Sequence, residues 1–142
     1  DRPVPPDVRV VLGDSMGEMA GYYGAADVAF VGGSLVPLGG QNLIEAIAMG
    51  TPVLVGPHTF NFADAAEGAV GAGAALRVAD ADAMLAAAAA LVGDRSRREE
   101  MRSRAEGFLA AHRGAAARTW TFVAARLRAR TPVGESIPPD AG

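Results

Sequence analysis

Short apolar runs alternate with segments of helical periodicity over the first two thirds of the chain. The apolar runs have the length of buried strands and lie at Val8–Leu12, Asp27–Val31, Pro52–Val55 and Ala74–Val78. Each is followed by a segment that we expect to be helical: Gly17–Ala25, Asn42–Met49, Asn61–Val70 and a segment from Asp80, as N-cap, to Val92. This βαβαβαβα order predicts an α/β fold, a Rossmann-like parallel sheet with helices on both faces.

The last third of the chain is predicted to be helical as far as residue 130. The pattern favours one helix over Arg95–Arg113 and another over Ala115–Arg130, with a break near Gly114. Residues 131–142 contain three prolines and have the composition of a disordered tail. We therefore expect a single domain over residues 1–130. Ligands of such sheets bind outside the carboxyl ends of the strands, which directs attention to the loops there.

Composition excludes several kinds of chemistry. The 142 residues are 50% hydrophobic and 20% charged, as in a soluble globular domain, and no apolar run reaches the roughly 20 residues that span a bilayer. All 13 basic residues are arginine, so a Walker-type lysine and a pyridoxal Schiff base are excluded. Cysteine is absent, and the two histidines show no zinc-binding spacing. We expect no metal and no cofactor.

Charge is distributed unevenly. Up to Asp94 there are 3 arginines against 11 acidic residues, and beyond it 10 arginines against 5, which gives about −8 and +5. The basic part is interpreted either as solvated helix faces or as a surface for anionic lipid or a phosphorylated acceptor. The second interpretation assigns a membrane-facing surface to Arg95, Arg97, Arg98, Arg102 and Arg104. Few aromatic residues accompany the arginines, so nucleic acid is not an expected partner.

The segment from Gly32 to Glu45 is the most informative part of the sequence. Its two glycine pairs allow backbone amides to approach an anion closely, and Ser34 adds a hydroxyl. Asn42 and Glu45 have the spacing of a capping box, in which Glu45 only reaches back to the Asn42 amide. Alternatively, Glu45 accepts hydrogen bonds from the two hydroxyls of a ribose while the helix end holds the adjoining phosphate.

Two further loops follow predicted strands. Asp14–Glu18 is either a simple helix start or a loop in which Met16 packs on a base. Gly56–Phe62 contains His58, which we expect to be a hydrogen-bonding residue near the ligand. A nucleophilic Ser34–His58 pair is disfavoured because no Gly-x-Ser-x-Gly elbow surrounds the serine.

Four motifs together resemble one family. They are Asp14-Ser15-Met16-Gly17-Glu18, the run from Ala26 to Val36, Gly39-Gly40-Gln41-Asn42-Leu43-Ile44-Glu45, and Gly56-Pro57-His58-Thr59-Phe60-Asn61-Phe62. In this order they resemble the carboxyl-terminal domain of bacterial 3-deoxy-D-manno-octulosonic acid (Kdo) transferases. The resemblance covers about Val8 to about Arg118.

The resemblance implies the carboxyl-terminal half of an inverting GT-B glycosyltransferase. Such an enzyme transfers Kdo from CMP-Kdo to the lipid A precursor in lipopolysaccharide biosynthesis, at the cytoplasmic face of the bacterial inner membrane. The donor-binding residues that we predict from the motifs are Met16, Gly17, Glu18, Gly33, Ser34, Gly40, Gln41, Asn42, Leu43, Ile44 and Glu45. The chain departs from the family pattern at Gln41, where histidine is usual, at Leu43, where proline is common, and at Ser15, where threonine is usual.

The resemblance also implies parts that these residues do not supply. A preceding domain would carry the acceptor site, the catalytic carboxylate base and the membrane anchor, so we expect this chain alone to be a soluble, catalytically inactive fragment. Two alternatives stay open at this point. One is a nucleotide-binding module without catalysis, and the other is a GT-B transferase or an epimerase that uses a UDP-sugar.

Overall fold

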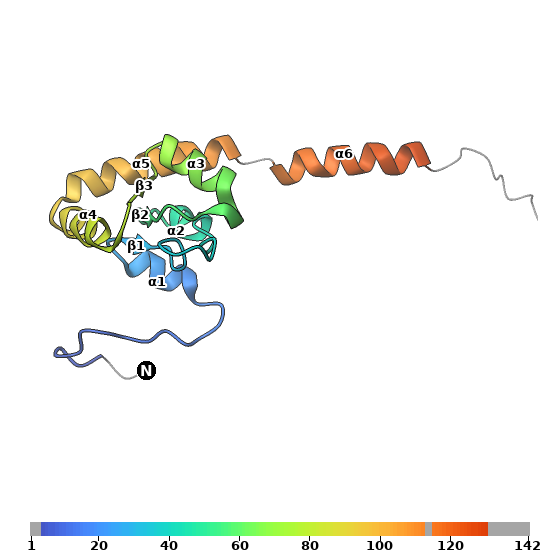
Figure 1. Ribbon diagram of the computed structural model, residues 1–142. Coiled ribbons are helices and arrows are strands. Elements are labelled where there is room, and N and C mark those ends of the chain that lie inside the picture. The colour runs from blue at the N-terminus through green and yellow to red at the C-terminus, as the bar shows by residue number, and fades with distance from the viewer. Residues whose placement is uncertain (1–3, 113–114, 131–142) are drawn as a thin grey trace, which may run out of the picture. The chain divides into compact units, whose positions relative to one another are not determined.

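The structure is a computed structural model that describes residues 4–112 and 115–130 (Figure 1). It divides into two units, Asp1–Leu109 and Ala110–Gly142, and each is described by itself. The predicted domain of residues 1–130 spans parts of both units, and its extent stays a prediction. The predicted tail, residues 131–142, lies outside the described residues.

The first unit contains a three-stranded parallel sheet in the order β1-β2-β3 (Figure 1). The strands are β1 (Ala29–Phe30), β2 (Val53–Val55) and β3 (Ala75–Arg77). The helices are α1 (Met19–Ala25), α2 (Ile44–Ala48), the 3₁₀ helix η1 (Phe60–Phe62), α3 (Ala63–Gly71), α4 (Ala81–Gly93) and α5 (Arg95–His112). Each crossover between paired strands contains a helix, so the predicted α/β class with a parallel sheet is confirmed.

Alternate residues of the strands face two separate hydrophobic layers. Val53 and Val55 pack with side chains of α2, α3 and α5, whereas Leu54 between them packs with α4. All three β2 side chains are completely buried. A central strand covered on both faces has a continuous apolar sequence, which explains why Pro52–Val55 is recognisable from the sequence.

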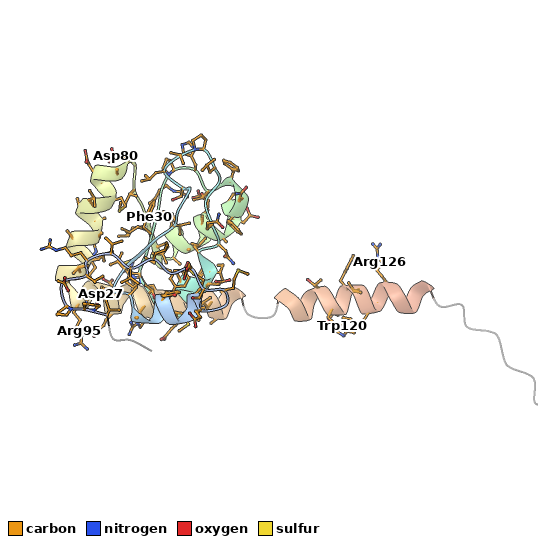
Figure 2. The ribbon with its side chains drawn as sticks, turned by 90° about the horizontal axis from the view of Figure 1, so that it is seen from below. Asp27, Phe30, Asp80, Arg95, Trp120 and Arg126 are labelled. Atoms are coloured by element: carbon orange, nitrogen blue, oxygen red, sulfur yellow. The ribbon has the colours of Figure 1, made fainter. Side chains whose placement is uncertain are left out.

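α4 and α5 follow β3 in the chain, and α4 begins as its sequence predicts. The Asp80 carboxylate accepts a hydrogen bond from the Ala83 amide at 2.8 Å, which makes Asp80 the N-cap of α4 (Figure 2). In α5, Met101, Ala105 and Phe108 are buried at helical spacing. The arginine-rich helix is therefore anchored to the core by one apolar stripe.

The first predicted strand is wrong. Val8–Leu12 forms no strand within the described residues, and its side chains are exposed, Val10 by 85% and Leu12 by 84%. An apolar run becomes a strand only when a neighbouring strand pairs with its backbone, and no described segment pairs with this one. Smaller differences concern helix starts: α2 begins at Ile44 instead of Asn42, and η1 separates β2 from α3, where the sequence predicted one helix from Asn61.

The second unit contains α6 (Ala115–Arg130), as predicted. The Arg126 guanidinium lies 4.9 Å from the centre of the Phe122 ring, one turn away on the same helix. Trp120 is 68% exposed, and the side chains of Trp120 and Arg126 project from different sides of the helix (Figure 2).

Candidate functional site

The glycine loop, Gly32–Gln41, leaves the carboxyl end of β1 and leads into α2. Gly33, Gly39 and Gly40 have φ angles of +74°, +87° and +72°. Residues with a Cβ rarely adopt these angles, so the loop needs glycine at these positions. The Gly40 amide donates to the Gly33 carbonyl at 3.3 Å and folds the loop back on itself.

Ser34 occupies the base of this loop and is completely buried. Its hydroxyl donates to the Val31 carbonyl at 2.6 Å and accepts from the Gly56 amide at 2.8 Å. The Ser34 carbonyl accepts a further bond from the His58 amide at 2.9 Å. The hydroxyl that we predicted to meet an anion is thus engaged with two backbone groups, and it joins the glycine loop to the loop after β2.

The start of α2 presents the pair Asn42 and Glu45 in an arrangement different from a capping box. The Asn42 side chain accepts a hydrogen bond from the Ile44 amide at 3.0 Å. Within the described residues, the Glu45 carboxylate accepts no hydrogen bond and forms no ion pair, although it lies in the first turn of the helix. Of the two interpretations of Glu45, capping therefore loses its support, and the side chain is exposed.

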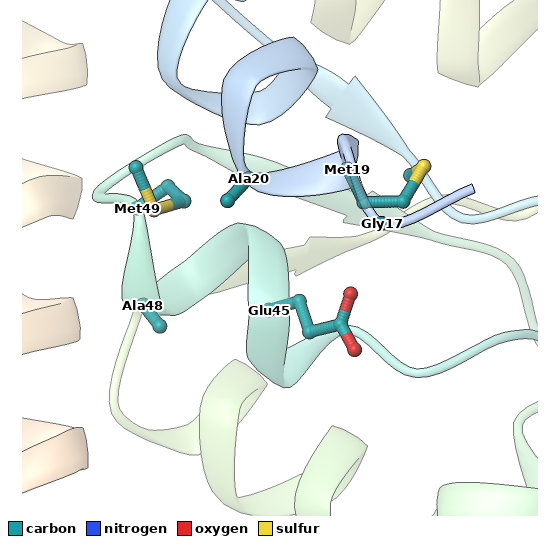
Figure 3. Close-up of a pocket in the computed structure, with 6 residues that line it drawn as sticks. All are labelled: Gly17, Met19, Ala20, Glu45, Ala48 and Met49. Atoms are coloured by element: carbon teal, nitrogen blue, oxygen red, sulfur yellow. The ribbon is translucent and has the colours of Figure 1, made fainter. Parts of the chain in front are cut away.

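Two hollows meet at Glu45. One, of about 470 Å³, lies between α1 and α2, and Figure 3 shows the Glu45 carboxylate on the side where Gly17 and Met19 lie. It is lined by Gly17, Met19, Ala20, Glu45, Ala48 and Met49. The other has about 440 Å³ and is lined by Met19, Tyr23, Phe30, Val31, Gly32, Gln41, Asn42 and Glu45. Met19 and Glu45 therefore line both hollows.

The structure gathers only part of the predicted site at these hollows. Gly17, Gln41, Asn42 and Glu45 line them, whereas the side chain of Met16 is 97% exposed and lines neither. Glu18 lines a separate hollow with Gly21 and Tyr22, and its carboxylate accepts from the Ser15 hydroxyl.

The other predicted residues belong to the framework. Gly33 and Gly40 shape the glycine loop, Leu43 is a core residue, and Ile44 opens α2. No observation of a ligand decides between these residues, so the set of donor contacts stays a prediction.

Sequence reasoning missed Met19, Tyr23 and Phe30, which supply apolar surface around Glu45. Met19 and Tyr23 are four residues apart, so both lie on one face of α1, a signal present in the sequence. Burial raises the pKa of Tyr23 above its usual value, and the nearby charge of Glu45 raises it further. At neutral pH Tyr23 is therefore an uncharged phenol that lines the same hollow as Glu45.

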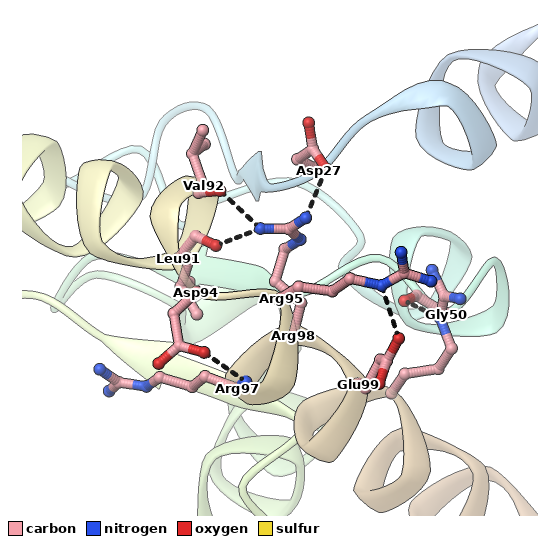
Figure 4. A network of polar contacts seen from close by, with 10 residues as sticks. Asp27, Gly50, Leu91, Val92, Asp94, Arg95, Arg97, Arg98 and Glu99 are labelled. Atoms are coloured by element: carbon pink, nitrogen blue, oxygen red, sulfur yellow. Dashed lines mark hydrogen bonds and ion pairs between the residues drawn. The ribbon is translucent and has the colours of Figure 1, made fainter.

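The arginine-rich start of α5 forms hydrogen bonds and an ion pair with other segments of the first unit (Figure 4). Arg98 donates to the carbonyls of Leu91 and Val92 at 2.6 and 2.7 Å and lies 3.2 Å from the Asp27 carboxylate. Arg102 donates to the Gly50 carbonyl at 3.1 Å. Two of the five arginines assigned to a membrane-facing surface thus bind helix ends.

The remaining arginines of that set are at the surface. Arg95 pairs with Glu99 and Arg104 with Glu100, both one turn apart on α5. Among residues 4–112 and 115–130 there is no group of three or more side chains suited to hold a metal ion. No helix in the same part of the chain has the length and apolar character needed to cross a membrane.

The chain is similar to known proteins over most of its length. The 3-deoxy-D-manno-octulosonic acid transferase of Bordetella pertussis is 59% identical over 114 residues, which are 80% of this chain and 27% of that protein. The enzyme of the same name from Haemophilus influenzae is 43% identical over 110 residues, 77% of this chain and 26% of that protein. The chain thus spans about a quarter of the length of these curated relatives.

A solved structure and a family model agree with these relatives. The crystal structure of the C-terminal CMP-Kdo binding domain of WaaA from Acinetobacter baumannii matches with a TM-score of 0.65 and 34% identity, over 68% of this chain and 51% of that one. The resemblance to Kdo transferases seen in the sequence is therefore confirmed. The family model "Glycosyl transferases group 1" matches residues 2–108. This chain belongs to the group 1 glycosyl transferases.

Proposed function

We propose that this chain is the donor-binding part of a Kdo transferase and that it binds CMP-Kdo at the hollows around Glu45. The observation that carries the proposal is the Glu45 carboxylate, which has no partner within the described residues and lies where two hollows meet at the carboxyl edge of a parallel sheet. The similarity to a CMP-Kdo binding domain supports this choice of ligand.

The residues around Glu45 suit the parts of a nucleotide. The carboxylate would accept hydrogen bonds from the two ribose hydroxyls, and such charge-assisted bonds are stronger than neutral ones. Side-chain amides of Gln41 and Asn42, with backbone amides of the glycine loop, would donate to the phosphate. α2 has only five residues, so we assign the phosphate to these amides and not to a helix dipole.

Apolar side chains complete the hollows. Met19, Tyr23 and Phe30 offer surface on which a pyrimidine or a sugar can pack. Gln41 can donate a hydrogen bond but cannot carry a proton, so we assign it binding and no acid–base role. We also propose that donor binding needs neither a metal nor a cofactor, because amide donors supply the contacts to the phosphate.

We propose that a longer protein containing this chain transfers Kdo to the lipid A precursor, with inversion at the anomeric centre. The transfer would take place at the cytoplasmic face of the bacterial inner membrane. The relatives that match are called Kdo transferases, and this chain spans 27% of the Bordetella pertussis protein. We place the acceptor site and the catalytic base outside these 142 residues.

Calorimetric titration of the chain with CMP, UMP and UDP tests the proposal. We expect CMP to bind, with no loss on addition of a chelator. Glu45→Gln keeps the shape of the side chain and removes its charge, so it should weaken CMP binding by about 1.5–3 kcal/mol, or roughly 10- to 150-fold. Glu106→Gln, at an exposed position of α5, is the matched control and should leave the affinity unchanged. Tighter binding of UDP than of CMP would favour a UDP-sugar enzyme instead.

A chimera tests the activity. Residues 4–112 of this chain would replace the matching segment of the Bordetella pertussis enzyme, and transfer of Kdo from CMP-Kdo to lipid A precursor would be measured. We expect transfer by the chimera and its loss with Glu45→Gln. A folded chimera that binds CMP but transfers nothing would contradict the proposed enzymatic role and leave a nucleotide-binding module.

A further inference from the structure

Asn61 lies in η1, after β2, and contacts the last residues of the glycine loop, 21 to 23 residues earlier in the chain. We propose that Asn61 is a positioning residue, which fixes the backbone that carries Gln41 and Asn42 without touching the donor. This inference rests on the proposed function, because it assigns Asn61 a role in the same site.

Asn61 donates hydrogen bonds to the backbone carbonyls of three successive residues, Leu38, Gly39 and Gly40. The Asn61 side-chain amide donates to the carbonyls of Leu38 and Gly40 at 3.1 and 3.4 Å, and the Asn61 backbone amide donates to the Gly39 carbonyl at 3.3 Å. A side-chain amide carries two N–H donors, which matches the two carbonyls that it meets. The side chain therefore acts as a clamp on the residues immediately before Gln41.

The glycine loop is shaped to receive this clamp. A Cβ on Gly39 would lie 2.4 Å from Asn61 Nδ2 and 2.6 Å from a ring carbon of Phe60, so only glycine fits against them. Gly39 and Gly40 both have positive φ, and because glycine populates positive and negative φ about equally, other contacts are needed to select this one conformation of the loop. Asn61 supplies those contacts.

Residues other than Asn61 fix the segment Gly56–Thr59, which precedes Asn61 in the chain. Arg77 donates to the Gly56 carbonyl at 3.0 Å and to the Thr59 hydroxyl at 3.4 Å, and it pairs with Glu67 at 2.6 Å. The Ser34 bond to the Gly56 amide holds the same loop from the other side. Removal of the Asn61 side chain should therefore make the last residues of the glycine loop, Leu38–Gly40, more mobile and leave the core intact.

Asn61→Asp gives the sharpest test, because it keeps the shape, removes both donors and sets a carboxylate against two carbonyls. We expect CMP affinity to fall at least 10-fold with a melting temperature within a few degrees of the parent chain. Asn61→Gln, which keeps the amide on a longer stem, should retain more affinity than Asn61→Asp. Asp64→Asn, three residues further along and exposed, is the control and should bind CMP as the parent does.

Hydrogen exchange of the free chain supplies a readout that does not depend on CMP. In Asn61→Asp, exchange of the Gly40 amide and its neighbours through Asn42 should become at least 10-fold faster, while β2 stays protected. Gly39→Ala combined with Asn61→Gly should be less than additive in affinity, because removal of the Asn61 side chain relieves part of the clash with the new Cβ and leaves the contact with Phe60.

The outcomes separate this inference from the proposed function. If CMP binds and Glu45→Gln weakens it, but Asn61→Asp binds as tightly as the parent, the inference is overturned and the function stands. If no CMP binds to the parent chain, the exchange measurement decides: unchanged exchange at Gly40 overturns the inference, and faster exchange confined to the glycine loop supports it.

Discussion

The Ser34 hydroxyl accepts a hydrogen bond from the Gly56 amide at 2.8 Å, and this bond joins two loops that leave neighbouring strands. Ser34 follows β1 and Gly56 follows β2, so the contact fixes the spacing of the two loops at the carboxyl edge of the sheet. The backbones are so close there that a Cβ on Gly56 would lie 2.2 Å from the Ser34 carbonyl oxygen. The site is thus built on a contact that admits no side chain at position 56.

Gly56→Ala should destabilise the first unit severely. Its methyl group meets backbone atoms, which cannot rotate away, so the loops must separate and the buried Ser34 hydroxyl loses its donor. We expect a loss of more than about 3 kcal/mol in the free energy of unfolding, measured by urea denaturation. Gly107→Ala is the control: its position within α5 has open space, so it should stabilise the helix by up to about 1 kcal/mol. A Gly56→Ala variant as stable as the parent would contradict the close approach of the two loops.

The pKa of Tyr23 provides a test of the site without a ligand. Burial raises this pKa above 10.0, and the Glu45 charge raises it further, so Glu45→Gln should lower it toward its usual value. A group whose pKa is raised on folding stabilises the fold fully below its unfolded pKa, and the contribution is lost as pH rises through the folded pKa. Unfolding should therefore become easier above about pH 10, and less so in Tyr23→Phe. Absorbance in the near ultraviolet, in a Tyr22→Phe background, would follow Tyr23 alone, and an unchanged pKa in Glu45→Gln would show that the two side chains do not interact.

Local patterns predicted most of the fold. Pro52–Val55 and Asp80–Val92 are recognisable because β2 is buried on both faces and Asp80 caps α4, and both signals lie within the segment itself. Val8–Leu12 has an equally strong apolar pattern and forms no strand, because strand formation also depends on a pairing partner elsewhere in the chain. Periodicity reports which residues prefer burial and carries no information on that partner.

The shape of the candidate site was predictable from the sequence where it depends on local backbone conformation, and less so elsewhere. Residue type and spacing predict that the glycine loop and Glu45 bind the ligand, and Glu45 lines two hollows; the ligand contact predicted for the Ser34 hydroxyl meets a group that already bonds to two backbone groups. The contacts of Asn61 with Leu38 and Gly40 join residues more than twenty positions apart, and no local pattern encodes such pairs. The same holds for Tyr23 and Glu45, which line one hollow from different helices.

Arg98 should contribute far more to stability than Arg97. The Arg98 side chain is 20% exposed and serves the last carbonyls of α4 as well as the Asp27 carboxylate. Arg98→Met should cost about 1–3 kcal/mol in the free energy of unfolding, because the Val92 carbonyl loses the Arg98 donor, the Leu91 carbonyl keeps only the Asp94 amide, and Asp27 loses its ion pair. Arg97→Met, at an exposed position of the same helix, should change stability by about 0.5 kcal/mol or less. Equal melting temperatures for the two variants would contradict the role of Arg98.

The membrane-facing surface that we expected on α5 should be weaker than the sequence alone indicates. Arg95, Arg98 and Arg104 each have an acidic partner, which leaves Arg97 and Arg102 without one among the described residues, and Arg102 donates to the Gly50 carbonyl. Each basic group close to an anionic membrane is worth about 1 kcal/mol, and the attraction fades within about 8 Å at physiological salt. We expect the chain to sediment with phosphatidylglycerol vesicles in low salt and to lose most of this binding at physiological salt. Replacement of Arg95, Arg97 and Arg104 by Gln together should abolish it, whereas Arg126→Gln in α6 should not. Binding that is indifferent to salt, or that is lost only on the change in α6, would exclude α5 as the membrane-facing element.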